Sequence, residues 1–239
     1  MTSTNGIASP ARPRVAILIV NGFARRGPLG PQRAAEALKY PWIELCLRQV
    51  ERYSRGWDYE VLVFDNSHFP PHRRVMRGFE RVRVMPGSWV AALGRIANRL
   101  PGPYAGRLFE RRHPSALDHL ARKVTADFDY IVTLDNDSFR VREDWLEVLV
   151  GECERGAAVA GVHRDEMAPA VHPFVHVSGL CVAARDLRSL NVSFGRDIDY
   201  LGEQTRQNDE YNQDVGQKIT YEFIRLGRDI APLERSNEV

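Results

Sequence analysis

Six consecutive apolar residues, from Val15 to Val20, constrain this chain more than any other feature of its sequence. A strand with one face in water alternates apolar and polar residues, whereas an unbroken apolar run is typical of a strand covered on both faces. The run is too short to cross a bilayer, and no small-residue cleavage site of a signal peptide follows it. The segment therefore predicts a central strand of a sheet with helices on both faces.

Strands and helices alternate along the rest of the chain, judged from apolar runs and from apolar residues at helical spacing. The predicted strands are 59–64, 81–85 (half-exposed or at an edge), 130–134, 157–162 and 174–183, the last interrupted at Ser178–Gly179. The predicted helices are 41–53, 114–124, 143–153 and 215–226, and residues 86–112 are predicted as a loop with a short helix near 90–97. This alternation predicts an α/β fold with a mostly parallel sheet.

Charge and cysteine content restrict the class of protein. The 239 residues carry 33 basic and 31 acidic side chains, so the net charge of +2 provides no field that would draw the chain to nucleic acid or membrane. Three isolated cysteines without a CxxC pair argue against a disulfide framework or a zinc cluster and are typical of a reducing compartment. We therefore expect a cytoplasmic protein with a flexible tail over residues 1–13 and one domain over 14–239.

An acidic motif follows the predicted strand 130–134, where the sequence reads Leu-Asp-Asn-Asp-Ser. Asp135 and Asp137 are two carboxylates one residue apart, and their mutual repulsion at the end of a buried strand is relieved when a cation joins them. Oxygen ligands of this kind suit Mg²⁺ or Mn²⁺ bound together with substrate phosphates. A turn or a helix cap would explain the same residues without a metal, and both interpretations stay open at this point.

A second predicted strand ends in a carboxylate 70 residues earlier, at Asp65, which is followed by Asn66 and Ser67. Ligands of open α/β sheets bind at the carboxyl ends of the strands. Asp65 and Asp135 are therefore expected at one ligand-binding edge. The signatures of two other nucleotide-binding classes are missing, because no GxGxxG pattern follows the first strand and the chain contains no GxxxxGK[ST].

Together, these segments resemble the GT-A glycosyltransferases, in particular the large family-2-like group. The matching stretches are VAILIVNG, YEVLVFDNSH, HPSALDHLARKVTADFDYIVTLDNDSF, HVSGLCVAARDL and DVGQKITYEFIRLG, spread over most of residues 14–228. The resemblance implies a GT-A fold with a nucleotide-binding part over about 14–140 and an acceptor part over about 141–239. It also implies an enzyme that moves a sugar from a nucleoside-diphosphate sugar to an acceptor hydroxyl, with Mn²⁺ or Mg²⁺ as cofactor and inversion as the favoured outcome.

In this family, the ends of the first two strands bind the donor nucleotide. The resemblance implies that Val20 and Asn21 lie against the base. It implies further that Asp65, followed by Asn66, accepts a hydrogen bond from the base or the ribose.

The acidic motif of the family holds the metal. The resemblance implies that Asp137 is a direct ligand, and that Asp135, next to Asn136, contacts the ribose or a metal-bound water and is a second candidate ligand. His176 is a further candidate because some GT-A enzymes supply a late histidine, although a histidine within a strand is more often structural. The metal of the family bridges the diphosphate and neutralises charge on the leaving nucleoside diphosphate.

Two more segments are candidates for the site. Ser115 and Asp118 lie at i and i+3 of one predicted helix, on a face that would line the nucleotide pocket. Toward the C-terminus the family carries an acid that deprotonates the acceptor hydroxyl. Asp214 fits this role best because it directly precedes a predicted helix, with Asp209 and Glu210 as alternatives. The same position would also suit a helix N-cap without a catalytic role.

Two other functions compete with glycosyl transfer. An aspartyl-type phosphatase would use the Asp135 and Asp137 pair as nucleophile and acid, and a domain that has lost its catalytic acid would only bind nucleotide-sugars. The sequence has no transmembrane or amphipathic anchor, so a small soluble acceptor is favoured over a lipid carrier.

Overall fold

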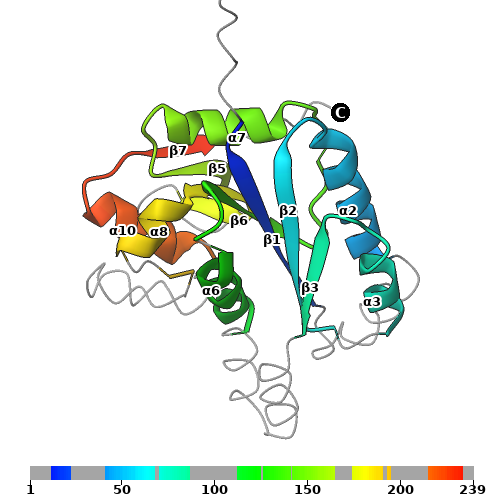
Figure 1. Cartoon of the computed structure of the whole chain (residues 1–239). Coiled ribbons are helices and arrows are strands. Elements are labelled where there is room, and N and C mark those ends of the chain that lie inside the picture. Colours follow the sequence, from blue (N-terminus) through cyan, green and yellow to red (C-terminus); the bar gives the residue numbers. More distant parts are fainter. Residues whose placement is uncertain are drawn as a thin grey trace, which may run out of the picture.

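The structure of the chain is a computed structural model (Figure 1), which describes residues 12–22, 41–67, 70–86, 112–124, 126–140, 142–164, 174–190, 193–194 and 215–233. The strands are β1 (Arg14–Asn21), β2 (Asp58–Asp65), β3 (Val82–Pro86), β4 (Tyr130–Asp135), β5 (Val159–Arg164), β6 (Phe174–Ala183) and β7 (Ile230–Leu233). The helices described are α2 (Trp42–Tyr53), α3 (Pro70–Met76), α6 (Arg112–Val124), α7 (Trp145–Glu154), α8 (Ala184–Leu190) and α10 (Gln217–Arg225).

The seven strands form one sheet in the order β3-β2-β1-β4-β6-β5-β7. Parallel pairs join β1 to β2 and to β4, β2 to β3, and β5 to β7. Strand β6 runs antiparallel to both of its neighbours, β4 and β5. The sheet is therefore mostly parallel, which confirms the predicted fold class, and β3 lies at one edge as its half-exposed pattern predicts.

Strand β1 is covered on both faces, as its unbroken apolar run predicts. All six residues of the run are buried, and successive side chains of a strand point to opposite faces of the sheet. One core contains Ala16, Leu18 and Val20, and the other contains Val15, Ile17 and Ile19. The sheet therefore separates two hydrophobic cores.

Helices close both cores. The core that contains Leu18 also contains Leu120 of α6, Leu187 of α8 and Phe223 of α10. The core on the other face takes side chains from α2, α3 and α7. In Figure 1, α6, α8 and α10 lie to the left of β1, while α2 and α3 lie to the right. Helices on both faces of the sheet confirm the predicted layers.

Strand β6 extends from Phe174 to Ala183 as one strand, but its pairing is irregular where the interruption at Ser178–Gly179 is predicted. The β5–β6 register changes from Gly161↔Leu180 to His163↔Val175, so residues 176–179 of β6 form a bulge opposite Val162. Gly161 has a φ of +149°, and a Cβ there would lie 1.9 Å from the carbonyl oxygen of Gly179. The two glycines therefore allow a close backbone approach at this bulge.

Two predicted helices begin at other residues in the structure. Helix α6 begins at Arg112, two residues before the predicted start, so His113 belongs to its first turn. Helix α10 begins at Gln217, and its N-cap is Gly216 with a φ of +100°. A Cβ at Gly216 would lie 2.5 Å from the carbonyl oxygen of Val175, so only glycine fits at this cap. The N-cap interpretation of Asp214 is therefore wrong.

Three short elements, α3, α8 and β7, could not be predicted from the sequence pattern. Helices α3 and α8 have seven residues each, too few to show a helical repeat. Strand β7 has four residues, contains Pro232, and lies at the sheet edge where a proline is tolerated. The predicted loop over 86–112 and the tail over 1–13 lie almost wholly outside the described residues.

All three cysteines, Cys46, Cys153 and Cys181, are buried free thiols, as their spacing predicts. Burial raises the pKa of Cys46 to about 12, so this thiol stays neutral. Within the part of the chain that the structure describes, no helix has the length and the apolar character needed to cross a membrane.

Candidate functional site

Asp65, at the carboxyl end of β2, is the centre of a buried network. Its side chain is fully buried. Its Oδ1 accepts hydrogen bonds from the amide of Asn21 (3.2 Å) and from the backbone N–H (3.1 Å) and the hydroxyl (2.6 Å) of Ser67. Its Oδ2 pairs with Nε of Arg73 at 2.5 Å. Both oxygens are therefore occupied, and a ligand would reach this carboxylate only by displacing one of these donors.

Helix α3 brings two residues to this edge that the sequence pattern does not reveal. Arg73 supplies the charge opposite Asp65, and buried His72 has its Nδ1 3.5 Å from the amide nitrogen of Asn21. The signal for both is the short connection after β2, because a helix that begins within a few residues of a strand places its first turn at the same sheet edge. Arg73 is only partly exposed.

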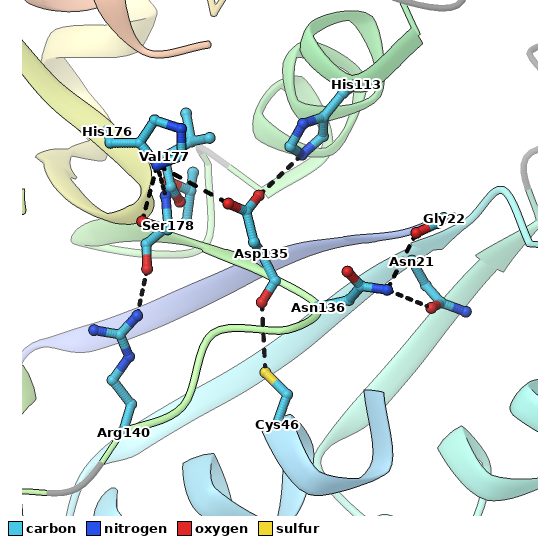
Figure 2. A network of polar contacts seen from close by, with 11 residues as sticks. Asn21, Gly22, Cys46, His113, Asp135, Asn136, Arg140, His176, Val177 and Ser178 are labelled. Atoms are coloured by element: carbon cyan, nitrogen blue, oxygen red, sulfur yellow. Dashed lines mark hydrogen bonds and ion pairs between the residues drawn. The ribbon is translucent and has the colours of Figure 1, made fainter. Parts of the chain in front are cut away.

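Asn136 joins the two acidic strand ends. Its amide donates to the side-chain oxygen of Asn21 (3.2 Å) and to the carbonyl oxygen of Gly22 (3.3 Å), as Figure 2 shows. Because Asn21 also donates to Asp65, a continuous chain of side-chain contacts runs from β2 through β1 to the end of β4. Val20 pairs with Asp135 in the sheet register and lies in the core beneath this chain. The structure thus brings the predicted residues of these three strands together.

Asp135 lies between two imidazole rings (Figure 2). Its Oδ1 is 3.6 Å from Nε2 of His113, in the first turn of α6, and its Oδ2 is 3.9 Å from Nδ1 of His176 on β6. The backbone oxygen of Asp135 also accepts from the thiol of Cys46 on α2, at 3.7 Å. Three elements from both faces of the sheet therefore hold the end of β4.

His176 is held in one orientation by Ser178. Its Nδ1 accepts the backbone N–H of Ser178 (3.2 Å) and lies 2.9 Å from the Ser178 hydroxyl. Since an Nδ1 that accepts a backbone N–H carries no proton, its contact with Asp135 is not a hydrogen bond. Any role of His176 as a metal ligand would fall to Nε2.

Arg140 ties the loop after β4 to the sheet. Its guanidinium donates to the carbonyl oxygen of Ser178 and lies over the ring of Trp145, 5.4 Å from the ring centroid. Burial lowers the pKa of Arg140. The loop that carries Asp137 is therefore anchored on both sides, by β4 and by Arg140 (Figure 2).

Asp137 is exposed at this edge. Its pKa is raised, first by the protein packed around the carboxyl and second by the negative charge of Asp135. A cation between the two carboxylates would relieve this repulsion. Among the described residues, no group of three or more His, Cys, Asp or Glu side chains is close enough to hold a metal by itself. The donor set therefore fits a Mg²⁺-type site that protein carboxylates form together with substrate phosphates and water.

Asp118 does not join this cluster. Its two oxygens accept the hydroxyl of Ser193 (2.9 Å) and the backbone N–H of Phe194 (2.8 Å), and burial raises its pKa. It therefore holds the 193–194 segment against α6. Ser115 lies partly buried on the same helix. The candidate bases Asp209, Glu210 and Asp214 lie outside the described residues.

Comparison with solved structures identifies the architecture. The mannosyltransferase PcManGT from Pyrobaculum calidifontis, in complex with GDP-Man and Mn²⁺, superposes with a TM-score of 0.56 and 13% identity over 94% of this chain and 56% of that protein. The chain has the GT-A fold. TarS from S. aureus (residues 1–349; TM-score 0.50, 12% identity, 95% and 59% coverage) and the galactosyltransferase LgtC with donor and acceptor sugar analogs (0.50, 14%, 91% and 72%) are further GT-A neighbours.

At identities of 12–14%, these likenesses concern the fold alone. The GT-A chain described here spans a little over half the length of the mannosyltransferase and TarS structures that it matches. No protein-family model matches its sequence, and no curated protein does either.

Proposed function

We propose that this protein is a metal-dependent glycosyltransferase that moves a sugar from a nucleoside-diphosphate sugar to an acceptor hydroxyl, with inversion. The observation that carries the proposal is the chain of polar contacts from Asp65 through Asn21 and Asn136 to the Asp135–Asp137 motif. It lies at the carboxyl edge of a GT-A sheet, the edge where open α/β sheets bind their ligands. The acceptor in this proposal is small and soluble.

In this proposal the nucleoside of the donor occupies the edge formed by β1 and β2. Val20 and Asn21, both buried, lie beneath the base, and Asn66, partly exposed after β2, contacts the base or the ribose. Asp65 accepts from the nucleoside when Arg73 swings toward the diphosphate, because the guanidinium is the more exposed partner of the pair, at 37% against 0%. A guanidinium suits bidentate phosphate binding. We leave Asp118 out of the donor site because Ser193 and Phe194 occupy its oxygens.

Asp137 and Asp135 are the residues proposed to hold Mn²⁺ or Mg²⁺, and Nε2 of His176 is a further candidate ligand. The cation would supply neutralisation of the charge that develops on the leaving nucleoside diphosphate. Anchoring by Arg140 and Cys46 keeps the two carboxylates at the edge where the diphosphate would lie. The neighbour PcManGT contains Mn²⁺ together with GDP-Man, which supports this choice of metal.

Asp214 is proposed as the base that removes the proton of the acceptor hydroxyl, with Asp209 and Glu210 as alternatives. Replacing Asp214 with asparagine is expected to lower kcat by at least about a hundredfold, because a positioned carboxylate typically contributes ~10²–10⁴-fold to such a step. Donor affinity and melting temperature should stay the same. Steady-state kinetics with Asp229→Asn, an exposed residue after α10, as the matched control would measure this. A variant with the full rate would move the role to Asp209 or Glu210.

The proposed function is tested by calorimetry and thermal shift with GDP, UDP, CDP, ADP and dTDP, each with and without Mn²⁺. We expect at least one nucleoside diphosphate to raise the melting temperature only when the metal is present. Binding that chelation leaves unchanged, or binding of none of the five, would contradict the proposal.

Two competing functions give different results in the same samples. An aspartyl-type phosphatase would hydrolyse a simple phosphomonoester and form a trapped phosphate ester on Asp135. A binding domain without catalysis would bind the nucleotide and metal but would not release nucleoside diphosphate from any activated sugar. The glycosyltransferase should leave the phosphomonoester intact and slowly hydrolyse its own donor.

A further inference from the structure

Four large apolar side chains in the described part of the chain are substantially exposed, and three of them lie close together. They are Trp42 (38%), Leu45 (40%), Phe139 (37%) and Leu226 (44%). The rings of Trp42 and Phe139 lie 5.8 Å apart at an angle of 46°. Leu45 lies one helical turn after Trp42, at i+3 on α2. Three of the four thus form one small patch, here called the Trp42 patch.

The Trp42 patch adjoins the candidate site. Phe139 is the second residue after Asp137 in the loop that follows β4. Helix α2 is tied to the same place, because the thiol of Cys46 donates to the backbone oxygen of Asp135. Two partly exposed aromatic side chains therefore lie beside the residues proposed to hold the metal and the donor diphosphate. Aromatic side chains left exposed next to a polar site are typical of ligand pockets.

Within the described residues, the patch is too small to bind a large partner. Even at ~250 Å² for a whole aromatic side chain, the exposed 37–40% of three side chains amounts to roughly 300 Å². A stable protein interface buries about 800 Å² on each partner, so a second copy of the chain would need much more surface. A ligand with one or two rings fits this area.

The charges of the described residues around the patch do not favour an anionic membrane. Asp137 is exposed beside Phe139, and Glu44, on the same turn of α2 as Leu45, is already paired with Arg48 at 2.7 Å. A surface that binds anionic lipids needs unpaired lysines or arginines around its apolar residues. The occupant should therefore be neutral and polar at its edges, with an apolar face.

We infer that the Trp42 patch binds a sugar ring of the acceptor, so that the acceptor is a carbohydrate. This inference rests on the proposed function and names its acceptor class. The face of an aromatic ring is electronegative, and the C–H groups on one face of a pyranose carry partial positive charge. A pyranose stacked on Trp42 or Phe139 would turn its hydroxyls toward Asp137 and the donor.

The test uses the full chain and saturation-transfer NMR with methyl glycosides and short neutral oligosaccharides of glucose, galactose, mannose and N-acetylglucosamine. We expect at least one of them to bind, with the strongest transfer to the protons of one ring face. Trp42→Ala and Phe139→Ala should each weaken binding by about tenfold, the usual loss of one stacking partner. Trp42→Tyr keeps an aromatic face and should retain binding. Leu226→Ala, which removes the exposed residue outside the patch, is the matched control.

The outcomes separate this inference from the proposed function. Carbohydrate binding that Trp42→Ala and Phe139→Ala leave unchanged in folded protein, or binding of none of the sugars, would overturn the inference. Retention of the protein on phosphatidylcholine vesicles that depends on Trp42 would also overturn the inference. Nucleoside diphosphate binding is measured in parallel. Sugar binding through Trp42 without any metal-dependent nucleotide binding would overturn the proposed function and leave the patch as a carbohydrate site.

Discussion

Replacing Asp137 with alanine is expected to abolish sugar transfer without weakening the fold. Loss of an outer-shell partner typically costs 10–100-fold in metal affinity or activity, so loss of a direct ligand should lower transfer by more than about a hundredfold. The fold should tolerate the change because Asp137 is exposed and its raised pKa means that the ionised carboxylate is disfavoured where it lies. The metal-dependent part of nucleoside diphosphate binding should disappear in calorimetry.

The control for this prediction is Asp144→Ala. Asp144 is an exposed carboxylate seven residues later, paired with Arg142 at the start of α7. The Asp144→Ala substitution should leave nucleotide binding and its metal dependence as they are in the wild type. If Asp137→Ala retains metal-dependent nucleotide binding, the motif is a turn and the metal site has to be sought elsewhere.

Replacing Asp65 with alanine is expected to lower the free energy of unfolding by about 2–4 kcal/mol. The change leaves the buried donors of Asn21 and Ser67 without their acceptor and leaves Arg73 without its counter-charge. The cost stays below that of a fully buried ion pair because Arg73, which is 37% exposed, can turn to water. Urea denaturation followed by circular dichroism measures the difference.

Asp58→Ala provides the comparison on the same strand. Asp58 lies at the opposite end of β2, is 65% exposed, and approaches Arg14 only at 3.9 Å. A surface pair of this kind contributes about 0–1 kcal/mol. Equal effects of the two substitutions would mean that the network around Asp65 contributes no more to the free energy of unfolding than a surface ion pair does.

The central elements of the fold could be predicted because each carries a pattern of its own. The run from Val15 to Val20 indicates burial on both faces, and the structure places alternate residues of the run in two cores. The acidic ends of β2 and β4 could be assigned to one edge because parallel strands align their carboxyl ends. Repetition along a strand or helix is a local signal, so the sequence alone reveals it.

Other features depend on contacts that no local pattern records. The resemblance implied that Asp65 receives a hydrogen bond from a nucleotide, yet in the structure its carboxylate is occupied by Arg73, which comes from a helix too short to show periodicity. His113 became a neighbour of Asp135 only because α6 begins two residues early. The bulge of β6 at Ser178–Gly179 brings Gly179 into close approach with Gly161, a residue 18 positions away. Each of these features concerns a pair of residues from different elements.

The late position of β6 in the chain has a consequence for synthesis on the ribosome. Strand β4 ends at residue 135, but the residues that pair with its free side are 180–183 of β6, so 45 residues must be added before pairing can start. At 5–20 residues per second this takes about 2–9 s. During that interval the nascent chain exposes an unpaired, apolar strand edge of the kind that templates aggregation. Production of this protein should therefore depend on holdase chaperones, or on slow expression at low temperature, to a degree that its net charge alone does not indicate.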